Sequence, residues 1–190
     1  FDPDVLISDL DVNALDTDYS MDGTMWAAFS TYWDDSAAYV YKSTDHGATW
    51  QMFTNLHWSP KQRVEDVGIV VGEGDSGFVH VFMYHPDHRG SHYDVRLDHG
   101  GNVVSTHPVF EREDIANNIA VCRDYTGSDY WLYAFICGVF PDDWCFFLRS
   151  TDYGASWAIT ESIQGYFYPH VSAGADRHIY LAGSYEGFTT

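Results

Sequence analysis

Short apolar runs separated by polar, glycine-containing turns dominate this chain. The run at 130–137, Tyr-Trp-Leu-Tyr-Ala-Phe-Ile-Cys, is apolar at every position. A run of this length that is apolar on both faces predicts a strand covered on both sides by other sheets. No stretch shows the 3.6-residue periodicity of an amphipathic helix. The pattern therefore predicts an all-β fold.

An internal repeat defines how these strands are grouped. The string S-T-D-x-G-A-x-W occurs at 43–50 and returns at 150–157, and a degenerate copy at 96–103 keeps the aspartate and the glycine but ends in valine. The three aspartates, at 45, 98 and 152, are 53 and then 54 residues apart. A period of about 50 residues is typical of proteins built from repeated supersecondary units.

Each copy of the repeat contains four predicted strands, with the string in the turn between the third and the fourth. The expected strands are 10–15, 24–33, 37–42 and 51–56, with 16–23 as a turn; 66–71, 77–84, 93–97 and 102–110; 118–122, 130–140, 144–149 and 158–163; and two more, 169–173 and 178–184. The repeats cover about 4–57, 58–110 and 111–164, with a partial fourth at 165–190. Four-stranded antiparallel sheets at this period predict a single β-propeller unit of three full blades and an incomplete fourth.

The string resembles the Asp-box, or BNR repeat, of sialidase-like β-propellers. In that family the box joins the third and fourth strands of a blade and lies away from the catalytic face, so the resemblance implies a folding role. Its chemistry favours the same role, because the carboxylate can accept hydrogen bonds from turn N–H groups, the glycine can adopt a positive φ, and the tryptophan can fill the gap between sheets. We therefore expect structural and not catalytic roles for Ser43, Asp45, Gly47, Trp50, Asp98, Gly100, Ser150, Asp152, Gly154 and Trp157.

Composition narrows the possible partners. The 190 residues include 28 Asp+Glu against 9 Lys+Arg, a formal net charge of -19, and 22 of the 28 acidic residues are aspartate. A surface this acidic repels phosphate backbones, so we expect no nucleic-acid partner. No run reaches the roughly 18 apolar residues of a membrane span, so we expect no membrane insertion. Aspartate is typical of turns and cation sites, which fits a helix-poor protein.

Two clusters of side chains could bind a metal ion. His85, His88 and His92 have the close spacing of a metal-binding loop, with a polar, histidine-rich loop as the alternative. Asp16, Asp18 and Asp22 place oxygens at alternate positions, as a calcium loop does, with an Asp-rich connection between strands as the alternative. Calcium is therefore a possible cofactor, and no other cofactor is expected.

Other candidates concern redox state and ligand binding. Cys137 and Cys145 flank a predicted turn and could form a disulfide, or all three cysteines, Cys122 included, could be buried as small apolar residues.

A sialidase-type site would need a cluster of arginines, and none of the seven arginines lies in the R-I-P string that usually carries the family's first one. Aromatic residues near strand ends could stack on sugars or pack between blades: Tyr32, Trp33, Trp58, Tyr84, Tyr166, Phe167 and Tyr168.

These observations predict an extracellular or envelope-associated propeller module that binds a glycan or a protein partner, without a complete catalytic set. A fragment of a sialidase-like or other Asp-box glycoside hydrolase is the alternative. Self-assembly is a third prediction, because the open edge of strand 178–184 could accept segment 4–7 from the same chain or from a neighbouring copy.

Overall fold

The computed structural model describes residues 6–7, 9–31, 37–57, 63–72, 77–86, 91–111, 118–124, 131–138, 144–165, 167–174 and 178–185. Fourteen strands account for most of them, and all strand pairs are antiparallel. The described residues contain no helix, and so none that is long and apolar enough to cross a membrane.

The strands form four sheets in chain order, which we call blades 1 to 4. Blade 1 contains β1 (Val12–Tyr19), β2 (Met25–Thr31), β3 (Ala37–Ser43) and β4 (Gln51–His57). Blade 2 contains β5 (Asp66–Val71), β6 (Val79–His85), β7 (Ser91–Leu97) and β8 (Val103–Phe110). Blade 3 contains β9 (Asn118–Arg123), β10 (Leu132–Cys137), β11 (Trp144–Ser150) and β12 (Ala158–Gln164). Blade 4 contains β13 (Phe167–Ala173) and β14 (Ile179–Tyr185) within the described residues.

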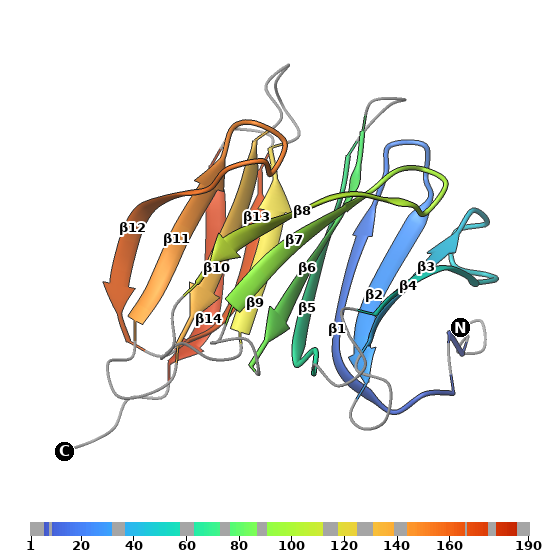
Figure 1. The fold of residues 1–190 in the computed structure, drawn as a ribbon, viewed down its shortest axis with the longest axis horizontal. Helices are drawn as coiled ribbons and strands as arrows, with labels where there is room; N and C mark the ends of the chain where they lie inside the picture. The colour runs from blue at the N-terminus through green and yellow to red at the C-terminus, as the bar shows by residue number, and fades with distance from the viewer. Residues whose placement is uncertain are drawn as a thin grey trace.

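The blades pack face to face and share their cores. Figure 1 shows them side by side, and the first strands β1, β5, β9 and β13 contact one another in that order. One core joins blades 1 and 2 through residues such as Trp26, Ile69 and Met83, and a second joins blades 2 and 3 through residues such as Phe82 and Leu132. Strands β6 and β10 are buried along their whole length because a sheet covers each of their faces. The three four-stranded sheets expected from the repeat are therefore present.

The first strand of blade 1 differs from its prediction. Strand β1 continues through Asp16 to Tyr19, where the sequence predicts a turn, and the turn to β2 follows at 20–24. Aspartate normally disfavours strands. Here the carboxylates of Asp16 and Asp18 accept hydrogen bonds from N–H groups of the neighbouring blade, at 2.9 Å from Ile69 and 2.7 Å from Val71. That cross-blade bonding holds these aspartates in strand conformation.

Each complete blade also carries a basic residue on its third strand, stacked over an aromatic ring. Lys42 Nζ lies 4.8 Å from the Phe53 ring centroid, and the guanidinium carbons of Arg96 and Arg149 lie 4.3 Å and 4.9 Å from the rings of Phe78 and Trp131. Three of the nine basic residues of the chain therefore serve as internal cation–π contacts. The sequence analysis did not anticipate this repeated feature.

A disulfide joins Cys137 and Cys145, which are directly paired residues of β10 and β11. This is the pairing that the sequence left open, and Cys122 is a buried free thiol. The predicted turn at 141–143 lies outside the described residues.

The edge of blade 4 bears on the predicted self-assembly. Strand β14 pairs with β13, and no other described strand pairs with it. In the expected donor segment 4–7, residues 4 and 5 lie outside the described residues, and the other two form no strand. The structure thus leaves self-assembly through this edge as a prediction.

Candidate functional site

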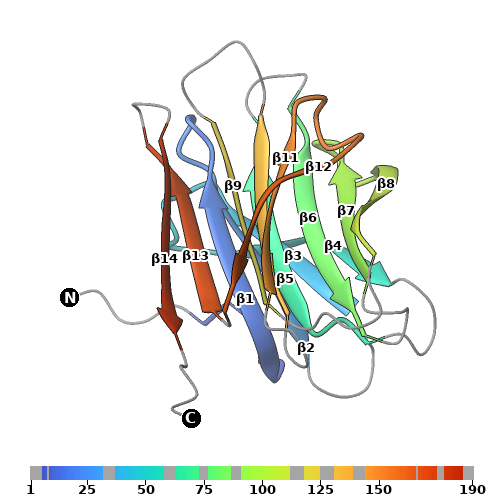
Figure 2. The same cartoon turned by 90° about the vertical axis from the view of Figure 1, so that its left-hand side faces the viewer.

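A cavity of about 570 Å³ lies where the starts of the four first strands come together. Its lining combines backbone, polar and aromatic groups from all four blades: Asn13 to Asp16, Arg63, Glu65 to Val67, Asn118 to Val121 and Tyr168 to Val171. Figure 2 shows β13, β1, β9 and β5 running side by side, and residues at their starts line the cavity. A central cavity reached by several blades is where this fold can assemble side chains from distant parts of the chain.

Two carboxylates of the cavity tie successive blades together. Asp16 Oδ2 accepts the Ile69 N–H at 2.9 Å, and Asp66 Oδ2 accepts the Ile119 N–H at 2.7 Å. The other oxygen of each accepts the N–H of the following residue, both at 2.9 Å. Each cross-blade partner lies 53 residues ahead, which is the repeat period, so these bonds replace the backbone pairing that first strands of different blades lack.

Burial changes how these two carboxyl groups titrate. It raises the pKa of Asp16 to about 6 and that of Asp66 to about 7, although their backbone hydrogen bonds act in the opposite direction. His170 on β13 and Asp18 also act electrostatically on Asp16, His170 lowering its pKa and Asp18 raising it. The pKa values of both carboxyl groups therefore lie close to neutral pH.

The charge of the cavity argues against an acidic ligand. Arg63 is the only Lys or Arg among the described lining residues, and it forms an ion pair with Glu65 at 2.5 Å. Arg96 and Arg149 lie over aromatic rings, Arg123 is buried at 2% exposure, and Arg89, Arg112 and Arg177 lie outside the described residues. The described cavity thus lacks the arginine cluster that a carboxylated sugar would require.

Tyr168 is the aromatic candidate that the structure places in the cavity, with 46% of its surface exposed. Tyr84, by contrast, is buried and stacks on His92 with ring centroids 4.8 Å apart, so it is a packing residue. Phe167 lies on β13, and Tyr32, Trp33, Trp58 and Tyr166 lie outside the described residues.

The structure does not bring the histidine candidates for a metal site together. His85 and His92 lie on the strands β6 and β7, where the sequence suggests a loop, and both are buried. Because His85 pairs with Ser91 while Tyr84 pairs with His92, the two imidazoles lie on opposite faces of the sheet. Burial lowers the pKa of His92 to about 3, so this ring is neutral. His88 lies outside the described residues.

The aspartate candidates for a calcium site bind different parts of the protein. Asp16 and Asp18 bond across to blade 2, whereas Asp22 accepts the Thr24 N–H at 2.9 Å and the Ser20 hydroxyl at 2.8 Å within its own turn. Among the described residues no group of three or more His, Cys, Asp or Glu side chains is arranged to bind a metal ion.

The first and third box turns have the geometry expected from their chemistry. Asp45 Oδ1 accepts the Thr49 N–H at 2.8 Å, and Asp152 Oδ1 accepts the Ser156 N–H at 2.9 Å. The hydroxyl groups of Thr49 and Ser156 donate to the second oxygen, both at 2.6 Å. The serine that opens each string, Ser43 or Ser150, accepts the N–H of the box glycine at 2.8 Å or 2.9 Å.

Backbone conformation and charge follow from this bonding. Gly47 and Gly154 have positive φ values of 88° and 78°, as predicted. Bonds from Thr49 and Ser43 lower the pKa of Asp45 to about 2. Burial alone would raise the pKa of Asp152, but the bonds from Ser156 and Ser150 outweigh it and lower the value.

The degenerate second turn is built differently. Strand β7 runs to the residue directly before Asp98, and Asp98 Oδ1 accepts the Gly100 and Asn102 N–H groups at 2.8 Å and 2.9 Å. The hydrogen bond from the Asn102 side chain, followed by that from its N–H, lowers the pKa of Asp98. In this turn the positive φ, 83°, belongs to Gly101 and not to the aligned Gly100. The side chain of Asn102 takes the place of the Thr49 or Ser156 hydroxyl.

The box turns and the cavity lie at opposite ends of the blades. Because strands alternate in direction, the turn between a third and a fourth strand lies beside the end of the first strand, whereas the cavity lies at the first strands' starts. The box residues are therefore remote from the cavity.

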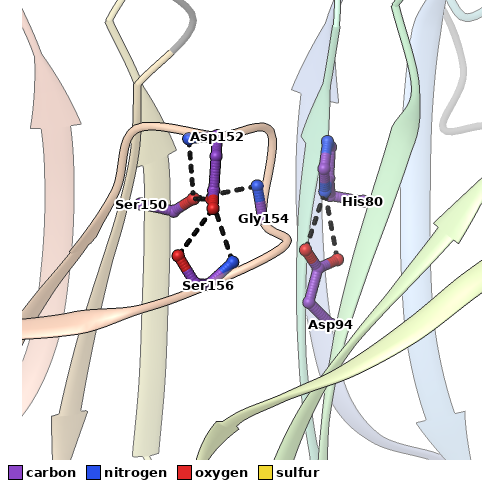
Figure 3. Close-up of polar contacts among 6 residues, drawn as sticks. All are labelled: His80, Asp94, Ser150, Asp152, Gly154 and Ser156. Carbon is purple, nitrogen blue, oxygen red and sulfur yellow. Dashed lines mark hydrogen bonds and ion pairs between the residues drawn. The ribbon is translucent and has the colours of Figure 1, made fainter.

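The third box turn packs onto a buried histidine–aspartate pair of blade 2. Trp157 is half-buried, and its ring lies edge-on to that of Phe82 with the ring centroids 5.6 Å apart. It therefore fills the gap between blades 2 and 3, as predicted. Trp50 is half-buried on blade 1. Figure 3 shows the same turn beside His80 and Asp94, whose Nδ1 and Oδ2 atoms lie 2.9 Å apart. Both side chains are fully buried, and burial raises the pKa of Asp94 against the opposing effect of His80. Sequence analysis missed this pair because its members are 14 residues apart on different strands.

Comparison with known proteins identifies the fold. No family model matches the chain, and no curated protein sequence matches it. Solved structures do match. A GH43 β-1,3-galactosidase matches with a TM-score of 0.53 and 12% identity, over 80% of this chain and 33% of that one. A second GH43 β-1,3-galactosidase, with galactodeoxynojirimycin, matches with a TM-score of 0.57 and 9% identity, over 89% of this chain and 66% of that one. An exo-β-1,3-galactanase from Phanerochaete chrysosporium with galactose also matches, with a TM-score of 0.55 and 9% identity, over 92% of this chain and 46% of that one.

The fold is a β-propeller. At 9 to 12% identity the similarity extends to fold alone, and the chain spans about one third to two thirds of the length of these proteins. The sialidase-like Asp-box assignment stays a prediction that rests on the box turns.

Proposed function

We propose that this propeller unit binds a carbohydrate in its central cavity. The observation that carries the proposal is the cavity of about 570 Å³ lined by all four first strands, a volume within the range of small-molecule sites. Its lining offers what sugar recognition needs, namely hydrogen-bonding groups from Asn13, Asn118 and the two aspartates, together with the exposed Tyr168 ring. The propeller neighbours named above are carbohydrate-active, which supports the same ligand class.

The ligand is a neutral sugar. Asp16, Asp66 and Glu65 contribute carboxyl groups to the cavity, and Glu65 already pairs with Arg63. In the described lining, a carboxylated sugar would find one Lys or Arg side chain, Arg63, which is already paired with Glu65, and this disfavours a sialic-acid ligand.

Saturation-transfer NMR with a panel of neutral and acidic sugars tests the proposal. We expect saturable binding of a neutral galactoside, and roughly tenfold weaker binding by Tyr168→Ala. Tyr180→Ala is the matched control, because Tyr180 is 56% exposed on β14 and does not line the cavity. Binding of sialic acid alone, or equal loss in both variants, would contradict the proposal.

Glycoside hydrolysis is the second candidate function. Asp16 and Asp66 favour it, since glycosidases use two carboxyl groups, one of them with a raised pKa. Nitrophenyl β-galactoside assays test it, with Asp66→Asn expected to abolish any turnover. Binding without turnover in the parent protein would leave a binding module.

We further propose an extracellular or envelope-associated location for the module. The Cys137–Cys145 disulfide supports it, because disulfides persist in oxidising compartments.

Self-assembly through the edge of β14 is tested by sedimentation of the parent protein and of the variant Leu181→Lys. Leu181 is 42% exposed on that strand. Identical monomeric behaviour at high concentration would exclude this assembly.

A further inference from the structure

The fifth residue after each box aspartate occupies an equivalent position at the end of its turn. In all three turns the aspartate accepts the N–H of the residue just before it, at 2.8 to 2.9 Å. In blade 3 this fifth residue is Trp157, which packs against the core between blades 2 and 3. In blade 2 it is Val103, which is 54% exposed. The second turn therefore has no tryptophan at this position, and the ring of Phe53 from blade 1 lies against its Gly101 instead.

A groove of about 350 Å³ remains between blades 1 and 2, beside Val103. It is lined by Asn55, Leu56 and His57 of β4 and by Met83, Val95, Val103 and Thr106 of blade 2. Leu56, Met83 and Val95 belong to the core shared by blades 1 and 2, so the groove continues an interface that is already apolar. It shares no lining residue with the central cavity.

We propose that this groove is a second ligand site, which binds the planar aromatic ring of an uncharged small molecule. The bound ring would pack between blades 1 and 2, as Trp157 packs between blades 2 and 3. The volume is sufficient for one bicyclic ring, and the described lining residues include no Asp, Glu, Lys or Arg. Asn55, His57 and Thr106 provide hydrogen-bonding groups for a polar atom on the ring, such as an indole N–H.

Fluorine NMR with 5-fluoroindole tests this site. The parent protein should cause a saturable shift with half-saturation at roughly 1 mM, as expected for a ligand of this size. Val103→Trp places an indole in the groove and should weaken binding at least tenfold. Val104→Trp is the matched control, because Val104 is 51% exposed and adjacent but does not line the groove, and it should bind like the parent.

Three results would overturn the proposal: no saturable shift with the parent protein, unchanged binding by folded Val103→Trp, or equal loss in Val104→Trp. If Val103→Trp fails to fold, Val103→Phe provides the same comparison with a smaller ring. Since the two sites share no residue, Tyr168→Ala should retain fluoroindole binding, so failure of the central sugar site does not decide this test.

Discussion

The carboxylate of Asp94 lies directly against Gly154, a residue of the next blade, and leaves no room for a Cβ atom there. At the equivalent Gly47 of blade 1, an added Cβ would meet only the Met25 sulfur, at 3.5 Å. The box glycine thus has two roles, a positive φ in both turns and a close contact between blades in the third.

Gly154→Ala should destabilise the protein more than Gly47→Ala. Both substitutions impose a left-handed alanine, which costs about 1 kcal/mol, and Gly154→Ala additionally displaces a buried carboxylate. We expect the two losses, measured by urea unfolding, to differ by more than about 1 kcal/mol. Equal losses would show that the contact with Asp94 does not constrain this turn.

His80 and Asp94 should behave as a coupled pair. His80→Leu leaves a fully buried carboxylate without its imidazole partner, and Asp94→Leu removes the carboxylate from a buried histidine, so each should cost about 3–5 kcal/mol. The double substitution should cost clearly less than the sum of the two. A double-mutant cycle with additive effects would contradict this coupling.

Asp66 should make stability depend on pH between about 4 and 7. Its pKa in the folded state is raised from 3.8 to about 7, so the folded protein binds more protons than the unfolded chain in this range. The stabilising contribution is fully present below pH 4 and is lost as pH rises through 7. The difference in unfolding free energy between the parent and Asp66→Asn should therefore fall over this range. Asp22→Asn is the control, since the pKa of Asp22 is lowered and its effect belongs below pH 4. A flat difference for Asp66→Asn would contradict the assignment.

The second hydroxyl of the box should contribute to turn stability without affecting the cavity. Ser156→Ala removes the 2.6 Å hydrogen bond to Asp152 and should cost about 1 kcal/mol, whereas Ser156→Thr should restore it, as Thr49 does in blade 1. Thermal unfolding measures both. Loss of sugar binding by a stable Ser156→Ala protein would contradict the structural role of the box.

The sequence was sufficient to predict the blades because the information is local and repeated. Each box aspartate bonds within five residues of itself, so its turn and the flanking strands follow from a short string. The strand end at Tyr19 was not predictable in this way, since Asp16 and Asp18 become strand residues only through N–H groups 53 residues away. The positive φ at Gly101 likewise depends on the shorter turn between β7 and β8, which the alignment of the three strings does not reveal.

The site could be predicted only in part for the same reason. Tyr168 was recognised as an aromatic near a strand end, but the cavity around it combines residues from 13 to 171 that only the packing of the four blades brings together. Asp66 carried no signal in the sequence, because its burial and its bond to Ile119 are tertiary features.

Backbone NMR during titration with the neutral galactoside that binds best tests the central claim most directly. If the cavity binds carbohydrate, the amide signals of Val67, Ile119 and Val171 should shift in a saturable way. The amides of the box turns at 45–49 and 152–156, at the opposite end of the blades, should not move. Saturable shifts confined to the box turns, or none at all with any neutral sugar, would contradict the account.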